Sequence, residues 1–151
     1  MIKAFQFIAM VLTALTLVPL GAHLFELPNK IDLGQTDYFI AQNIYRGWAL
    51  FGAVMVAAVA ANLVLAVLIR GDGVAFVLVV VNLLCLVATL MIFFAFTYPT
   101  NVATSNWTVI PKDWTDLRWQ WEASHAINAV IAFGGFCALT WSLLLEREET
   151  V

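Results

Sequence analysis

The sequence predicts an all-α protein in which four transmembrane helices pack as an antiparallel bundle. Of its 151 residues, 63% are hydrophobic and 11% are charged, and the mean hydropathy is +0.92, a composition typical of membrane proteins. Four apolar runs each reach the roughly 20 residues that a helix needs to cross about 30 Å of hydrocarbon. They cover residues 4–24, 44–69, 74–97 and 123–145, and the length leaves room for a single domain, residues 1–151.

The order of the four runs predicts how they cross the membrane. The first run follows Lys3, so it fits either a helix or the apolar core of a signal peptide, but no small-residue cleavage pattern follows it, and we expect a retained helix. The second and third runs are joined by the short link 70–73, which is typical of antiparallel neighbours. Both termini then lie on the side of this link. The opposite side receives two long connections, residues 25–43 and 98–122.

Basic residues indicate the orientation through the positive-inside rule. The raw count slightly favours the long connections as the cytoplasmic side. If Arg46 and Arg118 are site residues tied to carboxylates, the remaining count favours cytoplasmic termini, and we expect that orientation in a bacterial inner membrane. The basic residues on the side of the short link are Lys3, Arg70 and Arg147, and those on the other side are Lys30, Arg46, Lys112 and Arg118.

Ionisable residues gather at the long-connection end, where they are costly unless they are paired or used. Arg118, Glu122 and His125 follow one another at i, i+4 and i+7, which places them on one helix face, and Asn128 continues that face. We expect Glu122 to pair with Arg118 or Arg46. We also expect the connection 98–122 to fold over the mouth of the bundle as a lid, with Trp107, Trp114 and Trp119 packed there.

Three readings of this constellation are open. His125 can act as a general base near neutral pH, oriented by Glu122, while Arg118 and Arg46 stabilise a developing anion. Alternatively, two histidines and two carboxylates meet between the first and fourth helices and bind a transition metal, or the histidines serve as axial ligands of a haem. A third reading is a hydrogen-bond network that only secures helix ends, as in a non-catalytic accessory subunit of a membrane complex. The candidate metal ligands are His23, Glu26, Glu122 and His125.

The expected partners follow from composition and from the site. A net charge of −3 argues against nucleic acid and against a polybasic lipid-headgroup site. The apolar runs require a lipid bilayer. A polar site at the mouth of a membrane-embedded bundle suits a small, flat, hydrophobic and weakly acidic substrate. We also expect His23 and His125 to lie at the same membrane depth with their side chains turned into one cavity, which the shared-metal and shared-haem readings require.

Four sequence segments resemble the anthrone-oxygenase-like family of small four-helix membrane proteins. They are Ala22–Lys30, Ile44–Trp48, Pro99–Asn101 and the Arg-x-x-Trp-Glu-x-x-His pattern within Leu117–His125. In their order and spacing they extend the resemblance over essentially the whole chain.

The resemblance implies a four-helix membrane fold and, by analogy with fungal members, O2-dependent oxidation of anthrones to anthraquinones without a cofactor. Most bacterial members have no assigned activity, and the His23–Glu26 segment is typical of a bacterial subgroup. Asn128 stands where many relatives carry an arginine. The resemblance implies the site residues Asn101, Arg118, Trp121, Glu122 and His125. With the residues added by the base reading, the candidate catalytic set is His125, Glu122, Arg118 and Arg46, and the candidate substrate-binding set is Asn101, Trp121, Tyr45 and Asn128.

Overall fold

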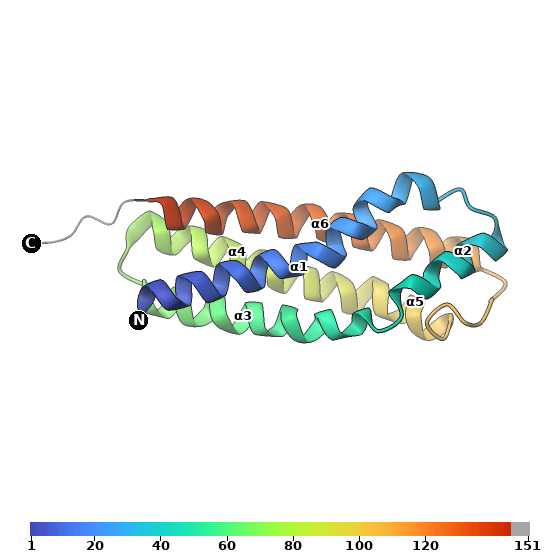
Figure 1. The fold of residues 1–151 in the computed structure, drawn as a ribbon, viewed down its shortest axis with the longest axis horizontal. Helices are drawn as coiled ribbons and strands as arrows, with labels where there is room; N and C mark the ends of the chain where they lie inside the picture. The colour runs from blue at the N-terminus through green and yellow to red at the C-terminus, as the bar shows by residue number, and fades with distance from the viewer. Residues whose placement is uncertain (146–151) are drawn as a thin grey trace, which may run out of the picture.

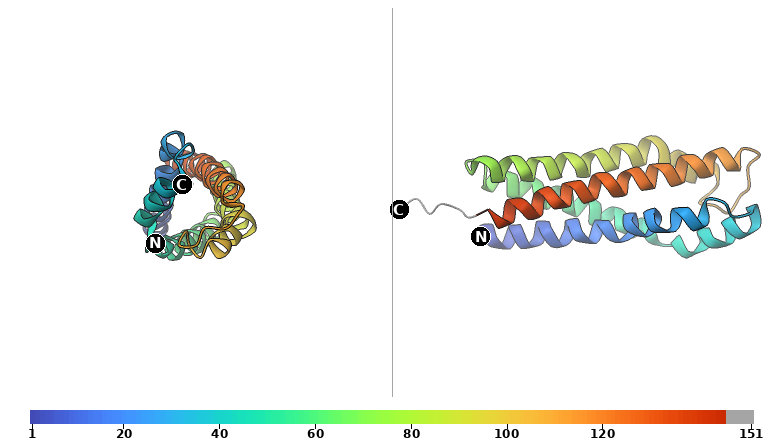
Figure 2. Two further views of the ribbon diagram at one scale, coloured as in Figure 1. Left: turned by 90° about the vertical axis from the view of Figure 1, so that its right-hand side faces the viewer. Right: turned by 90° about the horizontal axis from the view of Figure 1, so that it is seen from above.

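The computed structural model describes residues 1–145 and is helical along nearly all of that range (Figure 1). Four helical spans in this part of the chain are long and apolar enough to cross a membrane: Ile2–Lys30, Trp48–Leu68, Gly73–Ala103 and Trp114–Leu144. They run side by side as an up-down-up-down bundle, and the start of the first span lies at the same end as the finish of the last (Figures 1 and 2). The predicted all-α, four-span bundle is confirmed.

Shorter elements complete the chain between the long helices. The helix α1 (Ile2–Lys30) is followed by α2 (Gln35–Gln42), and two 3-10 turns, η1 (Asn43–Tyr45) and η2 (Trp48–Leu50), lead into α3 (Phe51–Leu68). After a tight turn, the third span consists of α4 (Gly73–Ile92), the π-helical segment η3 (Phe93–Thr97) and α5 (Tyr98–Ala103). The last helix is α6 (Trp114–Leu144).

Three of the predicted spans were too short at the end with the long connections. The first helix continues from the predicted residue 24 to Lys30, the third continues from 97 to Ala103, and the fourth begins at Trp114 rather than at 123. An apolar run ends where polar residues begin. The helix can continue past that point if neighbouring helices provide hydrogen-bond partners for the polar side chains. In the third span, Pro99 cannot donate a backbone hydrogen bond, and the helix widens before it: the Tyr98 N–H bonds the Phe93 carbonyl in the π-helical pattern.

The extended helices carry the bundle beyond the hydrocarbon layer on one side. The 31 residues of α6 rise about 46 Å, whereas the hydrocarbon is about 30 Å thick. The part of α6 from Glu122 to Leu144 alone rises about 33 Å, so Glu122 lies near the membrane boundary. Residues 26–50 and 98–122, which we call the cap, therefore lie at and beyond that boundary.

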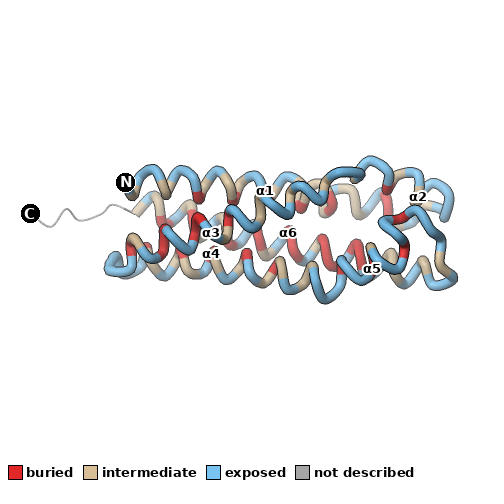
Figure 3. Tube along the Cα trace, turned by 90° about the horizontal axis from the view of Figure 1, so that it is seen from below, coloured by how far each residue is buried: buried red, intermediate tan, exposed pale blue. Residues whose placement is uncertain are grey.

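Small and aliphatic residues pack the inward faces of the four helices, and many large apolar side chains are exposed on the outside. Buried positions recur along the inner faces of the long helices (Figure 3). Within this apolar interior a buried polar group joins three helices. The Asn62 Nδ2 donates to Thr13 Oγ1 at 3.0 Å, and the Asn82 Nδ2 donates to Asn62 Oδ1 at 2.9 Å. Such hydrogen bonds hold helices together where lipid removes most of the hydrophobic driving force.

The closest approach of α4 and α6 gives a first prediction about stability. A Cβ added at Gly135 would lie 2.8 Å from both Asn82 Oδ1 and Cys85 Cβ, and the latter atom is fixed to the backbone of α4. Gly135→Ala should therefore lower the free energy of unfolding by about 1–3 kcal/mol, as overpacking does. Gly134 is the matched control, because an added Cβ there meets nothing within 4 Å. Thermal melts in detergent should show a loss for Gly135→Ala alone; equal melts of the two variants would contradict the tight packing.

Candidate functional site

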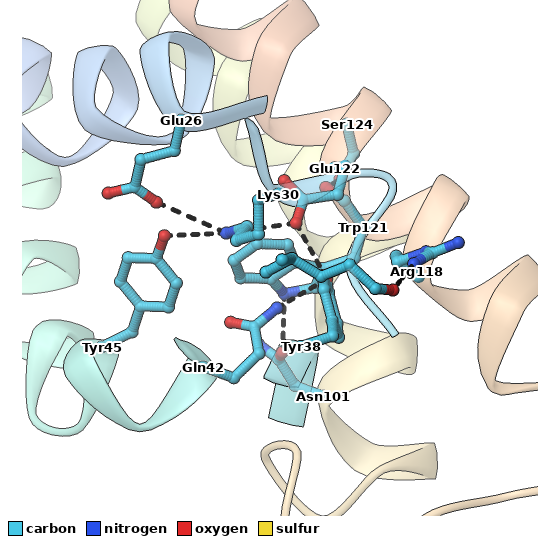
Figure 4. A network of polar contacts seen from close by, with 11 residues as sticks. Glu26, Lys30, Tyr38, Gln42, Tyr45, Asn101, Arg118, Trp121, Glu122 and Ser124 are labelled. Carbon is cyan, nitrogen blue, oxygen red and sulfur yellow. Dashed lines mark hydrogen bonds and ion pairs between the residues drawn. The ribbon is translucent and has the colours of Figure 1, made fainter. Parts of the chain in front are cut away.

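A buried lysine is the centre of the polar contacts in the cap. Lys30, at the last turn of α1, is 5% exposed, and its Nζ lies 3.1 Å from Glu122 Oε1 on α6. The same Nζ donates to Tyr45 Oη at 2.7 Å and lies 3.5 Å from Glu26 Oε2, one helical turn away (Figure 4). One cation thus joins α1, α6 and the segment between α2 and α3.

Tyr38 of α2 completes the surroundings of Glu122. Its side chain is fully buried, and its hydroxyl donates to Glu122 Oε1 at 2.8 Å while accepting from Gln42 Nε2 at 2.6 Å (Figure 4). Burial, reinforced by the neighbouring carboxylate, raises the pKa of Tyr38 well above its usual range. Tyr38 is therefore a neutral hydrogen-bond donor that holds the carboxylate in place.

The prediction that Glu122 pairs with Arg118 or Arg46 was wrong. The structure pairs it with Lys30, not with Arg118 or Arg46. The Arg118 Nη1 donates to the Leu33 carbonyl at 2.9 Å, and its guanidinium lies 4.8 Å from the ring centroid of Trp114. Arg46 is exposed, and its Nη2 donates to Asn43 Oδ1 at 3.1 Å. The physical reason is the length of α1, which continues six residues beyond its predicted end. This extension places the Lys30 ammonium next to the Glu122 carboxylate, where we had expected an arginine.

Directly below the cap, the two histidines of the chain face each other. The ring centroids of His23 and His125 are 4.1 Å apart at an interplanar angle of 34°, and both residues are buried. Trp121 packs edge-on against both rings, at 4.8 Å and 4.3 Å, and Tyr45 lies 4.4 Å from His23. The prediction that both imidazoles lie at one depth and turn to the same side is confirmed, and the structure shows their rings in direct contact. We call them the histidine pair.

The histidine pair has unused hydrogen-bonding capacity. Both Nδ1 atoms are buried, and neither has a hydrogen-bond partner among residues 1–145. The second carboxylate oxygen of Glu122, Oε2, is in the same condition within that part of the chain. Buried polar atoms of this kind are rare unless water or a ligand satisfies them. Three of them in adjacent turns of α1 and α6 mark this end of the bundle as the candidate site.

The aromatic enclosure of the pair has one part that does not belong to a long helix. Tyr45 ends η1 and Trp48 begins η2, and the ring centroid of Trp48 lies 5.7 Å from that of His23. Gly47 between them has a φ of 90°, a left-handed conformation that glycine adopts without strain. This short stretch covers the histidine pair from the side of α3.

Asn101 and Asn128, both predicted to bind substrate, are engaged with the protein. The Asn101 Oδ1 accepts from Trp121 Nε1 at 2.9 Å and so fixes the indole beside the histidine pair. The Asn128 Nδ2 donates to the Thr89 carbonyl at 3.2 Å, whereas its buried Oδ1 has no partner among the described residues.

The contact of Asn101 with Trp121 gives a second stability prediction. Asn101→Ala leaves the buried Trp121 N–H without an acceptor, which costs about 1–3 kcal/mol. Val102→Ala is the control, because Val102 is 60% exposed on the same helix. Chemical unfolding in detergent, followed by tryptophan fluorescence, should separate the two variants. Unfolding curves that coincide would mean that the bond contributes nothing.

The predicted lid is partly present. Trp107 is buried against Tyr38, and Trp114 packs on the same tyrosine, with ring centroids at 5.1 Å and 6.1 Å. The backbone at Ser105, Asn106 and Trp107 is left-handed, a conformation that costs of order 1–3 kcal/mol for each such residue. Trp119 was wrongly placed in the lid: it lies on α6 and is 56% exposed.

The candidate metal ligands do not come together as the metal reading requires. Among residues 1–145, no three His, Cys, Asp or Glu side chains are grouped so that they could hold a metal ion. Glu26 and Glu122 face Lys30, which already neutralises them. The two imidazoles of the pair contact each other at 4.1 Å, so a haem does not fit between them as a shared ligand plane.

Reasoning from the sequence missed Lys30, Tyr38 and Gln42. Lys30 had a usable signal, since Glu26 precedes it by four residues, the spacing of an ion pair on a helix. Tyr38 and Gln42 share the same spacing on α2, but the eight residues of this helix carry no hydropathy signal that would reveal it.

Comparisons of the chain with protein-family models, with curated proteins and with solved structures found no match. The fold and the site define the class: a polytopic helical bundle of the membrane-spanning kind, with a buried lysine–glutamate pair and a histidine pair at one end.

Proposed function

We propose that this protein is an integral membrane oxidoreductase that takes a proton from a small, flat, hydrophobic aromatic substrate at the histidine pair. The observation that carries the proposal is the state of the two imidazoles, which are buried in contact with each other while both Nδ1 atoms have no partner among the described residues. The side chains around them are aromatic, and aromatic rings prefer aromatic neighbours in stacked or edge-on contact.

In this proposal His125 is the base, and Lys30 takes the anion-stabilising role that we had expected of Arg118 and Arg46. A general base must reach the proton it removes, and a cation near the developing anion lowers the barrier. The charge of Lys30 acts on both imidazoles, and Glu122 and Tyr45 hold its ammonium in place. Tyr45 and Trp48 lie on the side of the enclosure that does not belong to a long helix, and displacement of these two side chains would admit the substrate ring.

The resemblance to the anthrone-oxygenase-like family supplies the reaction class. A CH2 group between two aromatic rings loses a proton to His125, and the carbanion is oxidised by O2. The net change replaces two hydrogens by one oxygen, so the products are a ketone and one molecule of water.

The alternative that the polar residues only secure helix ends applies to the cap and not to the histidine pair below it. Lys30, Tyr38, Gln42 and one oxygen of Glu122 are joined in a continuous network that ties α1, α2 and α6 together. The Nδ1 atoms of the histidine pair lie outside this network and have no hydrogen-bond partner among residues 1–145. We therefore assign Tyr38, Gln42 and their hydrogen bonds to Glu122 to stability, and the histidine pair with the neighbouring charge of Lys30 to chemistry.

We place the protein in the bacterial inner membrane with cytoplasmic termini. Lys30 is buried in an ion pair, and Arg118 is half-buried against Trp114, so neither is a free charge for the positive-inside rule. The remaining basic residues are Arg46 and Lys112 at the cap end, against Lys3 and Arg70 at the other; Arg147, which follows α6 in the sequence, lies outside the described residues.

Turnover in nanodiscs tests the proposal. The purified protein should oxidise anthrone under O2, with ketone absorbance and O2 consumption above those of empty nanodiscs. A variant with both His23→Phe and His125→Phe keeps two rings in contact but loses the nitrogens, and it should have no activity while remaining folded. Wild-type rates equal to empty nanodiscs would contradict the proposal. A haem absorbance band or a stoichiometric metal in the same preparation would favour the metal-binding alternative.

A further inference from the structure

The histidine pair is closed on one side by residues 43–50, which we call the strap. The strap consists of the two 3-10 turns η1 and η2 with the residues between them, and it carries Tyr45 and Trp48. His23 and His125 are only 5% and 9% exposed. A molecule that reaches their rings therefore has to displace part of this enclosure.

The other walls of the enclosure belong to long helices. Both histidines and Trp121 stand on α1 and α6, and the Trp121 Nε1 donates to Asn101 Oδ1 at 2.9 Å. Trp121 is 4% exposed, so a movement of its indole would break a buried hydrogen bond. An opening at these walls would also require the long helices of the bundle to separate.

The strap is held against these helices by one hydrogen bond and by ring contacts. Within residues 1–145, its one side-chain hydrogen bond to a long helix is the bond that Tyr45 Oη accepts from Lys30 Nζ at 2.7 Å (Figure 4). The ring centroid of Trp48 lies 5.1 Å from that of Tyr45 and 5.7 Å from that of His23. Segments with few buried contacts open locally at a lower free energy than packed helices do.

Gly47 gives the strap a place to bend. Its φ is 90°, and a Cβ added there would meet nothing within 4 Å. The backbone conformation, and not a lack of space, is therefore the reason for glycine at this position. Gly47 stands between Tyr45 and Trp48, so rotation about its backbone bonds moves one ring relative to the other.

We propose that the strap is a gate over the histidine pair, with the hydrogen bond between Tyr45 and Lys30 as its latch and Gly47 as its hinge. When the latch breaks, the Lys30 Nζ still has Glu122 Oε1 at 3.1 Å and Glu26 Oε2 at 3.5 Å. Opening therefore leaves no buried charge without a partner. The ion pair between Lys30 and Glu122 also keeps α1 and α6 joined while the strap moves.

The outer side of the strap lies where the membrane meets water. Ile44 and Leu50 are 59% and 79% exposed there. An aromatic molecule with a polar group concentrates at this depth for the same reason as tryptophan and tyrosine side chains do. The gate gives such a molecule access to the imidazoles from the membrane boundary. The part of the gate in turnover rests on the proposed function, whereas the opening itself does not.

Carbethoxylation by diethyl pyrocarbonate measures the opening without a substrate. His23 and His125 are the only histidines of the chain, and peptide mass spectrometry of protein in nanodiscs reports how fast each is modified. Tyr45→Phe keeps the ring but removes the latch, so it should raise both rates about ten-fold, the effect of one hydrogen bond to a charged group.

Tyr38→Phe is the matched control for the latch. It removes a hydroxyl in the same cap, but that hydroxyl donates to Glu122 and does not hold the strap. Its modification rates should stay near those of wild type. An equal rise in Tyr38→Phe and Tyr45→Phe would mean that the whole cap loosens, and it would overturn the gate.

A pair of glycine variants tests the hinge. Gly47→Ala puts a Cβ on a left-handed residue, which disfavours the closed strap, so both histidines should again be modified faster. Gly52→Ala is the control, because Gly52 lies in α3 and an added Cβ also meets nothing within 4 Å. Equal rates in wild type, Tyr45→Phe and Gly47→Ala would contradict the gate.

The same measurements separate the gate from the proposed function. Modification that follows the strap, in a protein that does not oxidise anthrone, leaves the gate standing while the proposed function fails. Anthrone oxidation together with equal modification rates in all variants leaves the proposed function standing while the gate fails.

Discussion

Lys30→Met is expected to lower the free energy of unfolding by about 3–5 kcal/mol, the cost of removing one partner of a buried ion pair. Glu122 is 1% exposed, and after the change its carboxylate keeps only the hydroxyl of Tyr38 as a hydrogen-bond partner. Methionine fills the volume of the lysine stem, so the effect measures the lost charge rather than a cavity. Unfolding in detergent at neutral pH should report the loss directly.

Replacing the other partner of the ion pair, Glu122, should lower the free energy of unfolding by less. After Glu122→Gln, the Lys30 ammonium still has Tyr45 at 2.7 Å and the Glu26 carboxylate at 3.5 Å. In the double variant no buried charge is left alone, so the two losses should not add, and a coupling of about 0.5–3 kcal/mol is expected. Arg46→Met is the control, because exposed positions change stability by about 0.5 kcal/mol or less. A Lys30→Met protein that unfolds like wild type would show that the pair contributes nothing.

The sequence was sufficient to predict the bundle and the histidine pair because both depend on long-range regularities. Apolar runs of membrane-crossing length leave few arrangements, and four of them with one short link impose the up-down order. His23 and His125 each stand near the long-connection end of their helix, and facing the bundle costs less than facing lipid. Their contact at 4.1 Å follows from these two facts together.

The ends of the helices and the partner of Glu122 depended on contacts that hydropathy does not encode. Lys30 looks like a loop residue when only its charge is considered. Its place in α1 is stabilised by Tyr45 and Glu122, which lie 15 and 92 residues away in the chain. Tyr38 reaches Glu122 only because α2 folds back over the bundle. Packing in the cap therefore decides which cation pairs with Glu122. The sequence alone is compatible with Lys30, Arg46 or Arg118 as that cation.

His125→Ala is expected to reduce turnover of an oxidisable phenolic substrate by about 10²–10⁴, the contribution of a general base. Among the side chains of the site, imidazole is the one whose ordinary titration lies near neutral pH, and His125 stands on the helix that also carries Trp121 and Glu122. The loss should appear in kcat. Trp119→Ala is the control, since Trp119 is 56% exposed on the same helix.

His23→Ala distinguishes the two roles within the pair. If His23 only lines the binding site, its removal should raise KM for the substrate while kcat stays within a few-fold, because the base on α6 remains. If both imidazoles share the proton, the two single variants should lose kcat to the same extent, and the double variant should be little worse than either, as for residues that act as one unit. The distance of 4.1 Å between the ring centroids allows both outcomes. A His125→Ala protein that keeps full activity would remove the histidine pair from the chemistry and leave the cap network, with its purely structural role, as the reason for the polar residues.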